Sequence, residues 1–228
     1  SGGEFRSETY TEQLIDSTQG LRLARDEYVG GAFFEYTYAP TPDWTIVTGM
    51  RGDYSSQFGG LYSPRLNLRW QASPTTTLRA SAGKGWRSPY ALQENLGTLI
   101  SNRQVVLAET PDIEESWNTG ASFTQNFELG SGSGYITLDY YYTRFQNQLV
   151  GDRDASARQL VLRNQRGESW AHAAQADLNL KPIDGLELRA AYKWTDARQV
   201  LGGTERRQPY LPQHRLLGNA AYTLPGIL

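Results

Sequence analysis

The clearest structural signal in the sequence is the stretch SPRLNLRWQ at residues 63–71. Its apolar residues, Pro64, Leu66, Leu68 and Trp70, alternate with polar residues at every step. Successive side chains of a β-strand point to opposite faces of the sheet, so this alternation separates polar from apolar groups. The stretch therefore predicts a strand with one polar and one apolar face.

Three further stretches alternate in the same way, at residues 135–144, 174–180 and 186–195. Helical periodicity is nearly absent from the chain, which favours an all-β fold. We expect strands at about residues 27–38, 44–54, 61–72, 77–87, 113–128, 134–149, 160–180, 186–197 and 211–223, with one more within 4–15.

The connections between these strands fall into two alternating kinds. Short connections rich in turn-forming residues lie at residues 39–43, 73–76, 130–134 and 181–185. The connections at the opposite ends are mostly longer, at about residues 87–112, 151–158 and 199–209, with a shorter one near residues 55–60. This alternation predicts an antiparallel up-and-down meander of about 9–10 long strands.

The length of these strands points to a membrane. They exceed the roughly 5 to 6 residues usual in globular sheets and the roughly 9 to 11 that cross a bilayer at a tilt. Aromatic residues near strand ends fit the girdles of membrane barrels, at Trp44, Trp70, Phe127 and Tyr222. We therefore predict part of a transmembrane β-barrel, in contact with the lipid bilayer. A soluble sandwich with an aromatic core is the alternative.

Composition excludes several other classes of protein. The chain has 228 residues, of which 39% are hydrophobic and 12% aromatic, too many for a disordered segment. A formal charge of -2 gives no basic field for nucleic acid, so we expect no nucleic-acid partner. The absence of cysteine excludes disulfides, thiol catalysis and Cys-ligated metals.

Motifs for catalysis or metal binding are absent from the sequence. It holds no phosphate-binding glycine loop, no HExxH and no G-x-S-x-G. His172 and His214 have no second His or Cys nearby in sequence, and a structural role fits both. The segment Asp152-Arg153-Asp154 could bind calcium, but it fits a solvated turn better. We expect no enzyme activity, no cofactor and no metal site.

Four segments resemble TonB-dependent outer-membrane receptors. They are LYSPRLNLR at 61–69, RASAGKGWRSPY at 79–90 followed by LQEN at 92–95, EESWNTGASF at 114–123 and RQPYLPQHR at 207–215. Their order and spacing extend the resemblance over about residues 27–223. Two details, ENLG at 94–97 and SNRQ at 101–104, are similar to receptors of the Bacteroidetes type.

This resemblance implies a location in the outer membrane of a Gram-negative bacterium. In this family a barrel of about 22 strands encloses an N-terminal plug domain. The implied function is energised uptake of a scarce nutrient, such as a ferric siderophore, haem, cobalamin or a glycan. The implied partners are that nutrient at the outer loops and TonB, which acts through the plug.

The chain departs from the family pattern, since it shows no plug domain, no TonB box and no final strand ending in Phe or Trp. We therefore expect residues 1–228 to form a single partial barrel domain without the plug and the final strands. The unpaired strand edges would either let the sheet curl or pair edge to edge between copies. A passive porin-like channel and a soluble all-β binding or adhesion module are the alternative functions.

A first set of candidate residues lies where a predicted strand ends and a long loop begins. Lys84, Trp86, Arg87 and Tyr90 suit capture of an anionic or aromatic ligand, although Trp86 also fits an interfacial girdle. Long outer loops commonly carry recognition residues. We expect ligand contacts from Trp86, Arg87, Tyr90, Glu94, Asn95, Asn102, Arg103 and Gln104.

A second set lies on the polar sides of the predicted strands. In an intact barrel that side faces the lumen, where mixed charges form structural ladders, line a wet path or contact a plug. The predicted lumen-facing residues are Arg51, Asp53, Arg65, Arg69, Arg79, Asp139, Asp177, Glu187, Arg189, Lys193 and Arg215.

Overall fold

The computed structural model describes residues 1–15, 20–95, 103–153, 156–201, 203–209 and 211–223. Among these residues no helix is long and apolar enough to cross a membrane. They form one short 3₁₀ helix and a 12-stranded sheet. The elements are β1 (Gly2–Ile15), β2 (Gly20–Thr41), β3 (Trp44–Ser55), β4 (Gly59–Ser73), β5 (Thr76–Arg87), η1 (Gln93–Asn95), β6 (Gln104–Leu107), β7 (Glu114–Leu129), β8 (Gly132–Asp152), β9 (Gln159–Ile183), β10 (Leu186–Leu201), β11 (Thr204–Arg207) and β12 (His214–Tyr222).

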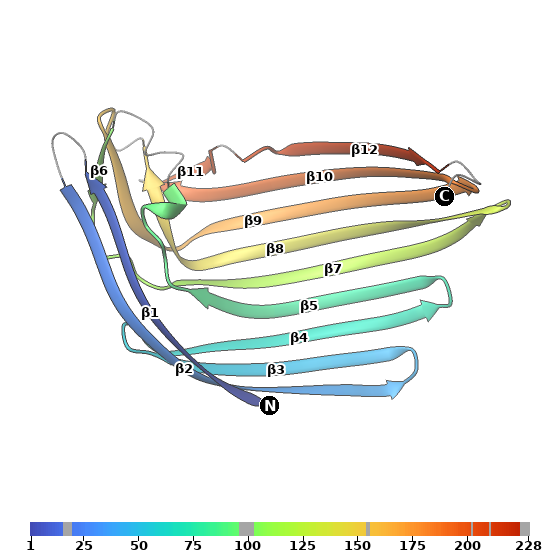
Figure 1. Cartoon of the computed structure of the whole chain (residues 1–228), viewed down its shortest axis with the longest axis horizontal. Coiled ribbons are helices and arrows are strands. Elements are labelled where there is room, and N and C mark those ends of the chain that lie inside the picture. Colours follow the sequence, from blue (N-terminus) through green and yellow to red (C-terminus); the bar gives the residue numbers. More distant parts are fainter. Residues whose placement is uncertain (16–19, 96–102, 154–155, 202, 210, 224–228) are drawn as a thin grey trace.

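The long strands form one antiparallel meander that curves into an open trough (Figure 1). The strand order is β1-β2-β3-β4-β5-β7-β8-β9-β10-β11, and β12 pairs with β10. Strand β6 is the exception, since it pairs with β9 in parallel. Within the described residues the outer edges of β1 and β12 pair with no further strand.

The structure confirms the predicted all-β meander of long strands. Glycines with positive φ occupy two of the predicted short turns, at Gly130 (φ 61°) and Gly185 (φ 80°), a conformation that only glycine adopts readily. Tight turns of this kind reverse the chain at one end of the sheet. Longer connections lie at the opposite end, which we call the loop end.

One predicted boundary was wrong, and two short strands were not predicted. Strand β2 begins at Gly20 rather than near residue 27, and β6 and β11 lie within segments 87–112 and 199–209, which were predicted as connections. Both missed strands have only four residues. So short a segment holds too little alternation to be recognised, and its pairing is set by neighbouring strands distant in sequence.

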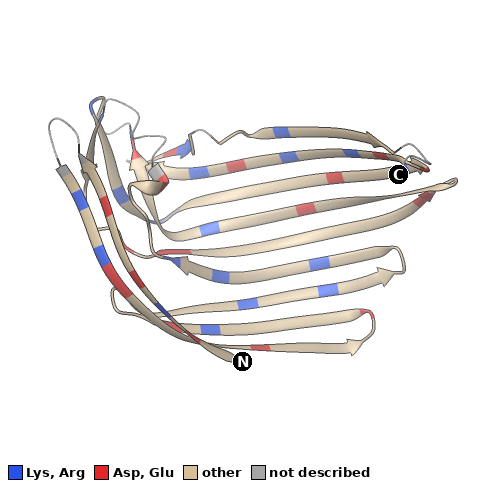
Figure 2. Cartoon of the chain, in the orientation of Figure 1, with Lys and Arg blue, Asp and Glu red and all other residues tan. Residues whose placement is uncertain are grey.

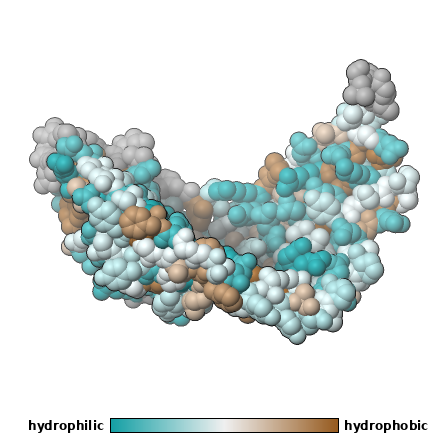
Figure 3. Space-filling model, turned by 60° about the horizontal axis from the view of Figure 1, so that its bottom comes forward, coloured by the Kyte–Doolittle hydropathy of each residue, from teal (hydrophilic) through white to brown (hydrophobic). Residues whose placement is uncertain are grey.

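The register between neighbouring strands gives the whole sheet two distinct faces. Charged residues recur along the strands in Figure 2. The strand pairings place the predicted polar positions on the same side of the sheet. They run from Arg51↔Ser63 and Arg69↔Arg79 to Lys193↔Arg215. All eleven residues predicted to face the lumen therefore share one face, which we call the polar face. Cavities lie against it inside the trough, where hydrophilic residues gather in Figure 3.

The opposite face, the apolar face, exposes many large side chains. Trp44 and Trp70 stack there near the short turns, with ring centroids 5.3 Å apart. Exposed aromatic and aliphatic groups in such number are typical of a surface that contacts lipid rather than water. Other exposed members of this face are Phe34, Tyr36, Tyr38, Met50, Leu66, Leu138, Tyr140, Leu216 and Tyr222.

Among the described residues, a compact apolar cluster forms at the loop end. Its buried members are Ala91, Leu92, Val105, Leu149, Leu160 and Leu162. They join the connection after β5 to strands β6, β8 and β9. Leu14, Leu21 and Leu23, from the ends of β1 and β2, pack against this cluster. The cluster therefore holds the loop end together while the rest of the sheet remains a single layer.

Candidate functional site

The candidate site lies where β4 and β5 separate at the loop end. Their pairing ends at Arg65↔Gly83, whereas β5 stays paired with β7 as far as Arg87↔Glu114. Trp86 reaches across the separation, and its Nε1 donates a hydrogen bond to Oδ2 of Asp53, 3.2 Å away. The site is thus opened by a local loss of strand pairing.

A cavity of about 810 Å³ lies beside this separation. Strand β3 contributes Arg51, strand β4 contributes Arg65, and β5 with the following residues contributes Trp86, Arg87 and Tyr90. The structure therefore brings three predicted ligand residues together with two predicted polar-face residues. Val29 and Phe33, on the polar face of β2, add apolar surface, so the cavity offers both stacking and hydrogen-bonding groups.

The cations of this cavity all have acidic partners. Arg51 binds Asp53 at 2.8 Å and Glu4 at 2.8 Å, and Arg65 pairs with Glu35. These contacts tie β1, β2, β3 and β4 together across the polar face. An anionic ligand must therefore compete with carboxylates for the guanidinium groups.

Lys84 is buried, in contrast to its predicted place at an exposed strand end. Its Nζ lies 2.7 Å from Glu115 and 4.1 Å from the ring centroid of Tyr62. A buried ammonium needs such a charge partner because burial removes its hydration. Its structural role is to hold β5 against β7 and β4.

The remaining predicted loop residues divide into two groups. Glu94 lies in η1 and binds Arg87 at 2.6 Å, while Arg87 also binds Glu114 on β7. Asn95 ends η1. These contacts fix the start of the loop above the cavity.

The second group lies elsewhere. Arg103 donates a hydrogen bond to the carbonyl of Arg153, 2.7 Å away, and Gln104 lies in β6 beside Gln159. Both therefore face the β8–β9 connection and line no part of the cavity as described. Asn102 lies outside the described residues.

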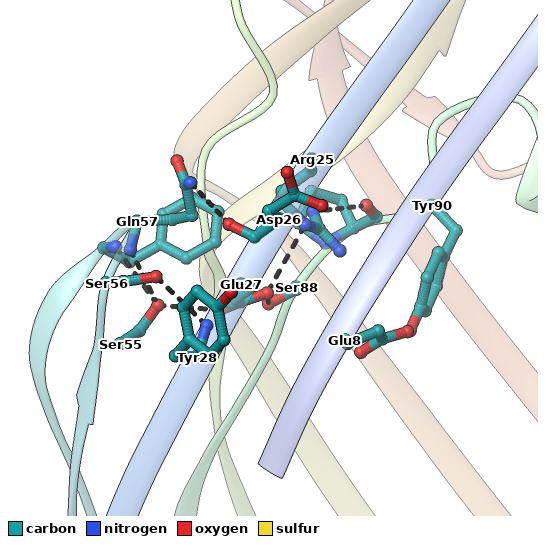
Figure 4. Close-up of polar contacts among 12 residues, drawn as sticks. Glu8, Arg25, Asp26, Glu27, Tyr28, Ser55, Ser56, Gln57, Ser88 and Tyr90 are labelled. Carbon is teal, nitrogen blue, oxygen red and sulfur yellow. Dashed lines mark hydrogen bonds and ion pairs between the residues drawn. The ribbon is translucent and has the colours of Figure 1, made fainter.

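Sequence reasoning missed a set of buried carboxylates that anchor the loop, shown in Figure 4. Glu27, only 2% exposed, accepts hydrogen bonds from Ser55 at 2.7 Å and Ser88 at 2.8 Å. Arg25 lies 3.4 Å from Glu27 and donates to the carbonyl of Pro89. One carboxylate thus joins β2, the end of β3 and the segment after β5.

Two acids of β1 extend this anchor. The hydroxyl of Tyr90 donates to Glu8 at 2.6 Å, and Glu12 accepts the backbone N–H groups of Leu92 and Gln93. The sequence does carry a signal for a polar strand face here, the alternation of Glu4, Arg6, Glu8, Tyr10 and Glu12, which our sequence analysis did not use. The partners of that face come from segments distant in sequence, so the pattern alone did not identify the anchor.

Electrostatics of the anchored loop follow from these contacts. The hydrogen bond to Glu8 and burial raise the pKa of Tyr90. Burial also raises the pKa of Glu94, and the nearby Arg87 guanidinium offsets part of this effect. Tyr90 therefore acts as a neutral hydrogen-bond donor.

Several predicted polar-face residues form ion pairs along the trough. Asp177 accepts from Arg189 at 3.2 Å, and Glu187 pairs with Lys181. Arg69 donates to Gln71. Asp139, Lys193, Arg215 and Arg79 lie on the same face by register.

The two histidines lie on the apolar face beside tyrosines. Nδ1 of His172 lies 2.7 Å from the hydroxyl of Tyr140, and Nδ1 of His214 lies 2.7 Å from that of Tyr192. Among the described residues no group of three potential metal-ligating acids or histidines occurs. Asp152 pairs with Arg163, and Asp154 lies outside the described residues.

A one-layer antiparallel sheet with a polar concave face and an apolar outer face is the wall of an outer-membrane β-barrel. Comparison with known proteins identifies the family. Residues 2–226 match the family model for the TonB dependent receptor-like β-barrel. The chain therefore belongs to the TonB-dependent receptor family, and its location is the outer membrane of a Gram-negative bacterium.

The curated relatives are an outer-membrane protein and a receptor. The iron-regulated outer membrane virulence protein of Vibrio cholerae is 22% identical over 96% of this chain and 35% of its own length. The probable TonB-dependent siderophore receptor PirA of Acinetobacter baumannii is 27% identical over 44% of this chain and 13% of its own length. The chain spans about a third of the length of the first of these curated relatives.

Solved structures agree on the fold. The siderophore receptor PirA from Acinetobacter baumannii matches 88% of this chain and 32% of its own chain, with a TM-score of 0.65 and 14% identity. The ferric enterobactin receptor PfeA from Pseudomonas aeruginosa, as an R480A mutant in complex with enterobactin, matches 87% of this chain and 31% of its own, with a TM-score of 0.64 and 14% identity.

These findings confirm the predicted family, barrel fold and cell location. They also bear out the prediction that the chain is not an enzyme, because it belongs to a receptor family and its relatives are named as receptors or as an outer-membrane protein. The narrower assignment to the Bacteroidetes type stays a prediction.

Proposed function

We propose that this chain forms part of a receptor for TonB-dependent uptake of an iron chelate, with a ferric siderophore as the first candidate. The observation that carries the proposal is the family match over residues 2–226, together with relatives named for iron regulation and siderophore binding. Further strands would pair with the edges of β1 and β12 to complete the barrel, and a plug domain would fill it.

The loop-end cavity supports ligand binding at this place. It combines the indole of Trp86 and the phenol of Tyr90 with the guanidinium groups of Arg51, Arg65 and Arg87. Aromatic surfaces stack on planar ligand groups, and guanidinium groups bind anionic oxygens in pairs. A large ligand with aromatic and anionic groups suits this combination better than a small neutral solute.

The test is iron uptake in the native bacterium under iron limitation. Deletion of the gene that encodes this chain should abolish uptake of radioactive iron supplied as one chelate from a panel of catecholate and hydroxamate siderophores. Haem and cobalamin in the same panel separate iron chelates from other nutrients. Unchanged uptake of every siderophore would contradict the proposal.

A second deletion, of the TonB gene, separates the receptor from a passive porin-like channel. Energised uptake stops without TonB, whereas diffusion through an open channel continues. The soluble binding module is disfavoured, because the exposed aromatic face and the family match both place the chain in the membrane.

A further inference from the structure

The lining of the loop-end cavity is strongly unequal in charge. Among the described residues that line it, five are basic and one, Glu4 of β1, is acidic. The basic residues are Arg6, Arg51, Arg65, Lys84 and Arg87. Acids that pair with these cations from behind, such as Asp53 and Glu115, line no part of the cavity as described. A single carboxylate that faces the cations from inside the cavity needs an explanation.

Arg51 is held by two carboxylates that differ in burial. Its Nε and Nη2 contact the carboxylate of Asp53 at 2.9 Å and 2.8 Å, and the Asp53 side chain is fully buried. Its Nη1 donates to Oε2 of Glu4 at 2.8 Å, and the Glu4 side chain is 53% exposed. Asp53 therefore occupies the inner side of the guanidinium group, and Glu4 occupies the end that faces the cavity.

A glycine lets these groups meet across β2. Glu4, Gly31 and Asp53 lie opposite one another on β1, β2 and β3. A Cβ atom added to Gly31 would lie only 1.9 Å from Oδ1 of Asp53. The missing side chain at residue 31 therefore leaves the space that the Asp53 carboxylate fills. Asp53 in turn orients Arg51 toward Glu4.

The two contacts of Arg51 differ in how easily they break. A buried charge that loses its partner cannot regain its hydration, so the contact with Asp53 is costly to break. An exposed ion pair contributes little, because water solvates both groups when they separate. Glu4 can therefore leave Arg51 while Asp53 keeps the guanidinium group in place, with Nη1 open to another oxygen.

A ligand with several anionic oxygens has an advantage over Glu4 at this place. One of its oxygens takes the position of the Glu4 carboxylate on Arg51, and a second reaches Arg65 in the same cavity. The single carboxylate of Glu4 makes only the first of these contacts. A neutral or cationic ligand gains nothing from the exchange, so it leaves Glu4 in place.

We propose that Glu4 is a specificity-determining residue, an internal carboxylate that occupies the anion site on Arg51 until an anionic group of the ligand displaces it. It selects ligands that carry two or more anionic oxygens, such as carboxylates, over neutral and cationic ones. The inference rests on the proposed function in that the displacing anion belongs to the transported nutrient. The exchange on Arg51 does not depend on which nutrient that is.

The experiment is a calorimetric titration of the complete receptor, in detergent at low ionic strength, with citrate, a small anion that has three carboxylates. Removal of the competing carboxylate in Glu4→Gln should tighten citrate binding about three- to fivefold, the size of an exposed ion pair. Glu187→Gln is the matched control, because Glu187 is an exposed acid that pairs with a lysine outside the cavity. It should bind citrate as the natural protein does. Triethyl citrate, which is neutral, should show no gain with either variant.

A double-mutant cycle separates displacement from a general change of charge. Arg51→Gln should weaken citrate binding, and the addition of Glu4→Gln to Arg51→Gln should restore none of it. Asp53→Asn should also weaken binding, although it removes a negative charge, because Arg51 loses the group that orients it.

Equal citrate affinity of the natural protein and Glu4→Gln would overturn the proposal, as would the absence of citrate binding in both. A gain from Glu4→Gln that persists without Arg51, or an equal gain in Glu187→Gln, would show a general charge effect and also overturn it. Failure of the iron-uptake assay, in contrast, would refute an iron chelate as cargo and leave these titrations unaffected. Intact iron uptake with no effect of Glu4 on citrate binding would refute the role of Glu4 alone.

Discussion

At the scale of single residues, the loop end depends on buried carboxylates that accept hydrogen bonds and form ion pairs. Glu27 is enclosed between Ser55, Ser88 and Arg25, so its charge is balanced by hydrogen bonds and an ion pair. A buried ion pair contributes little net stability compared with an apolar replacement, but removal of one partner leaves the other uncompensated. Substitutions here should therefore act locally and strongly.

Replacement of Glu27 by alanine should release the segment that follows β5. Arg25 would lose its partner and two hydroxyls would lose their acceptor, at a cost of about 3 kcal/mol. Hydrogen exchange at residues 88–93 should accelerate, while exchange in β7 to β10 stays the same. The control is Glu205→Ala, since Glu205 is a solvent-accessible acid whose loss should change little. Unchanged exchange in the Glu27 variant would contradict the anchor.

Trp86 lines the cavity and links β5 to β3 through its hydrogen bond to Asp53. Trp86→Phe keeps an aromatic wall but removes the N–H that donates to Asp53, so Arg51 alone would hold that carboxylate. We expect about three- to tenfold weaker binding of the cognate chelate, equivalent to roughly 1 kcal/mol for one hydrogen bond. Titration of the full receptor with the chelate checks this value. Arg189→Gln, far along the polar face, is the comparison variant, and an equal loss in both would argue against a specific role of Trp86.

At the scale of elements, two short pieces of secondary structure decide the shape of the loop end. Strand β6 pairs in parallel with β9, and η1 directs Glu94 toward Arg87. Both are held by the apolar cluster that includes Leu92, Val105 and Leu162. The connection after β5 is therefore a packed structure, at least in its described parts.

The apolar cluster predicts that alanine substitutions of two leucines will differ sharply in their effect on stability. Leu162 is 0% exposed, so Leu162→Ala should destabilise the loop end by about 3 kcal/mol through a cavity in the cluster. Leu216 on β12 is 83% exposed on the apolar face, so Leu216→Ala should cost far less in detergent. Limited proteolysis within residues 88–112 reports the difference. Equal resistance of both variants would show that the cluster does not hold this segment.

At the scale of the whole molecule, the sheet is defined by its two outer edges as much as by its faces. The backbone groups at the outer edges of β1 and β12 have no strand partner within the described residues. Unpaired edges are costly in lipid and prone to pair with other chains in water. In a complete receptor further strands would satisfy them. For this chain alone we expect the edges to pair with those of another copy, unless the sheet curls to bring its own edges together.

The chain by itself in detergent should therefore associate through its edges. Because the sequence contains no cysteine, single cysteines can be placed without background. Thr9→Cys on β1 and Asn219→Cys on β12 should form intermolecular disulfides on oxidation, whereas Ser122→Cys in the middle of the sheet should not. Light scattering should show a matching increase in mass. A monomer without disulfides in the edge variants would contradict edge pairing.

The sequence by itself determined the class of the fold, because alternation with a period of two records which face of a strand meets lipid and which meets water. SPRLNLRWQ at residues 63–71 was sufficient for a strand, and every predicted polar-face residue shares one face of the sheet. Only the tertiary structure decided which groups Trp86 and Glu27 contact. Their partners come from strands distant in sequence, and those contacts depend on register, on the separation of β4 from β5 and on the curvature of the sheet, none of which a local pattern encodes.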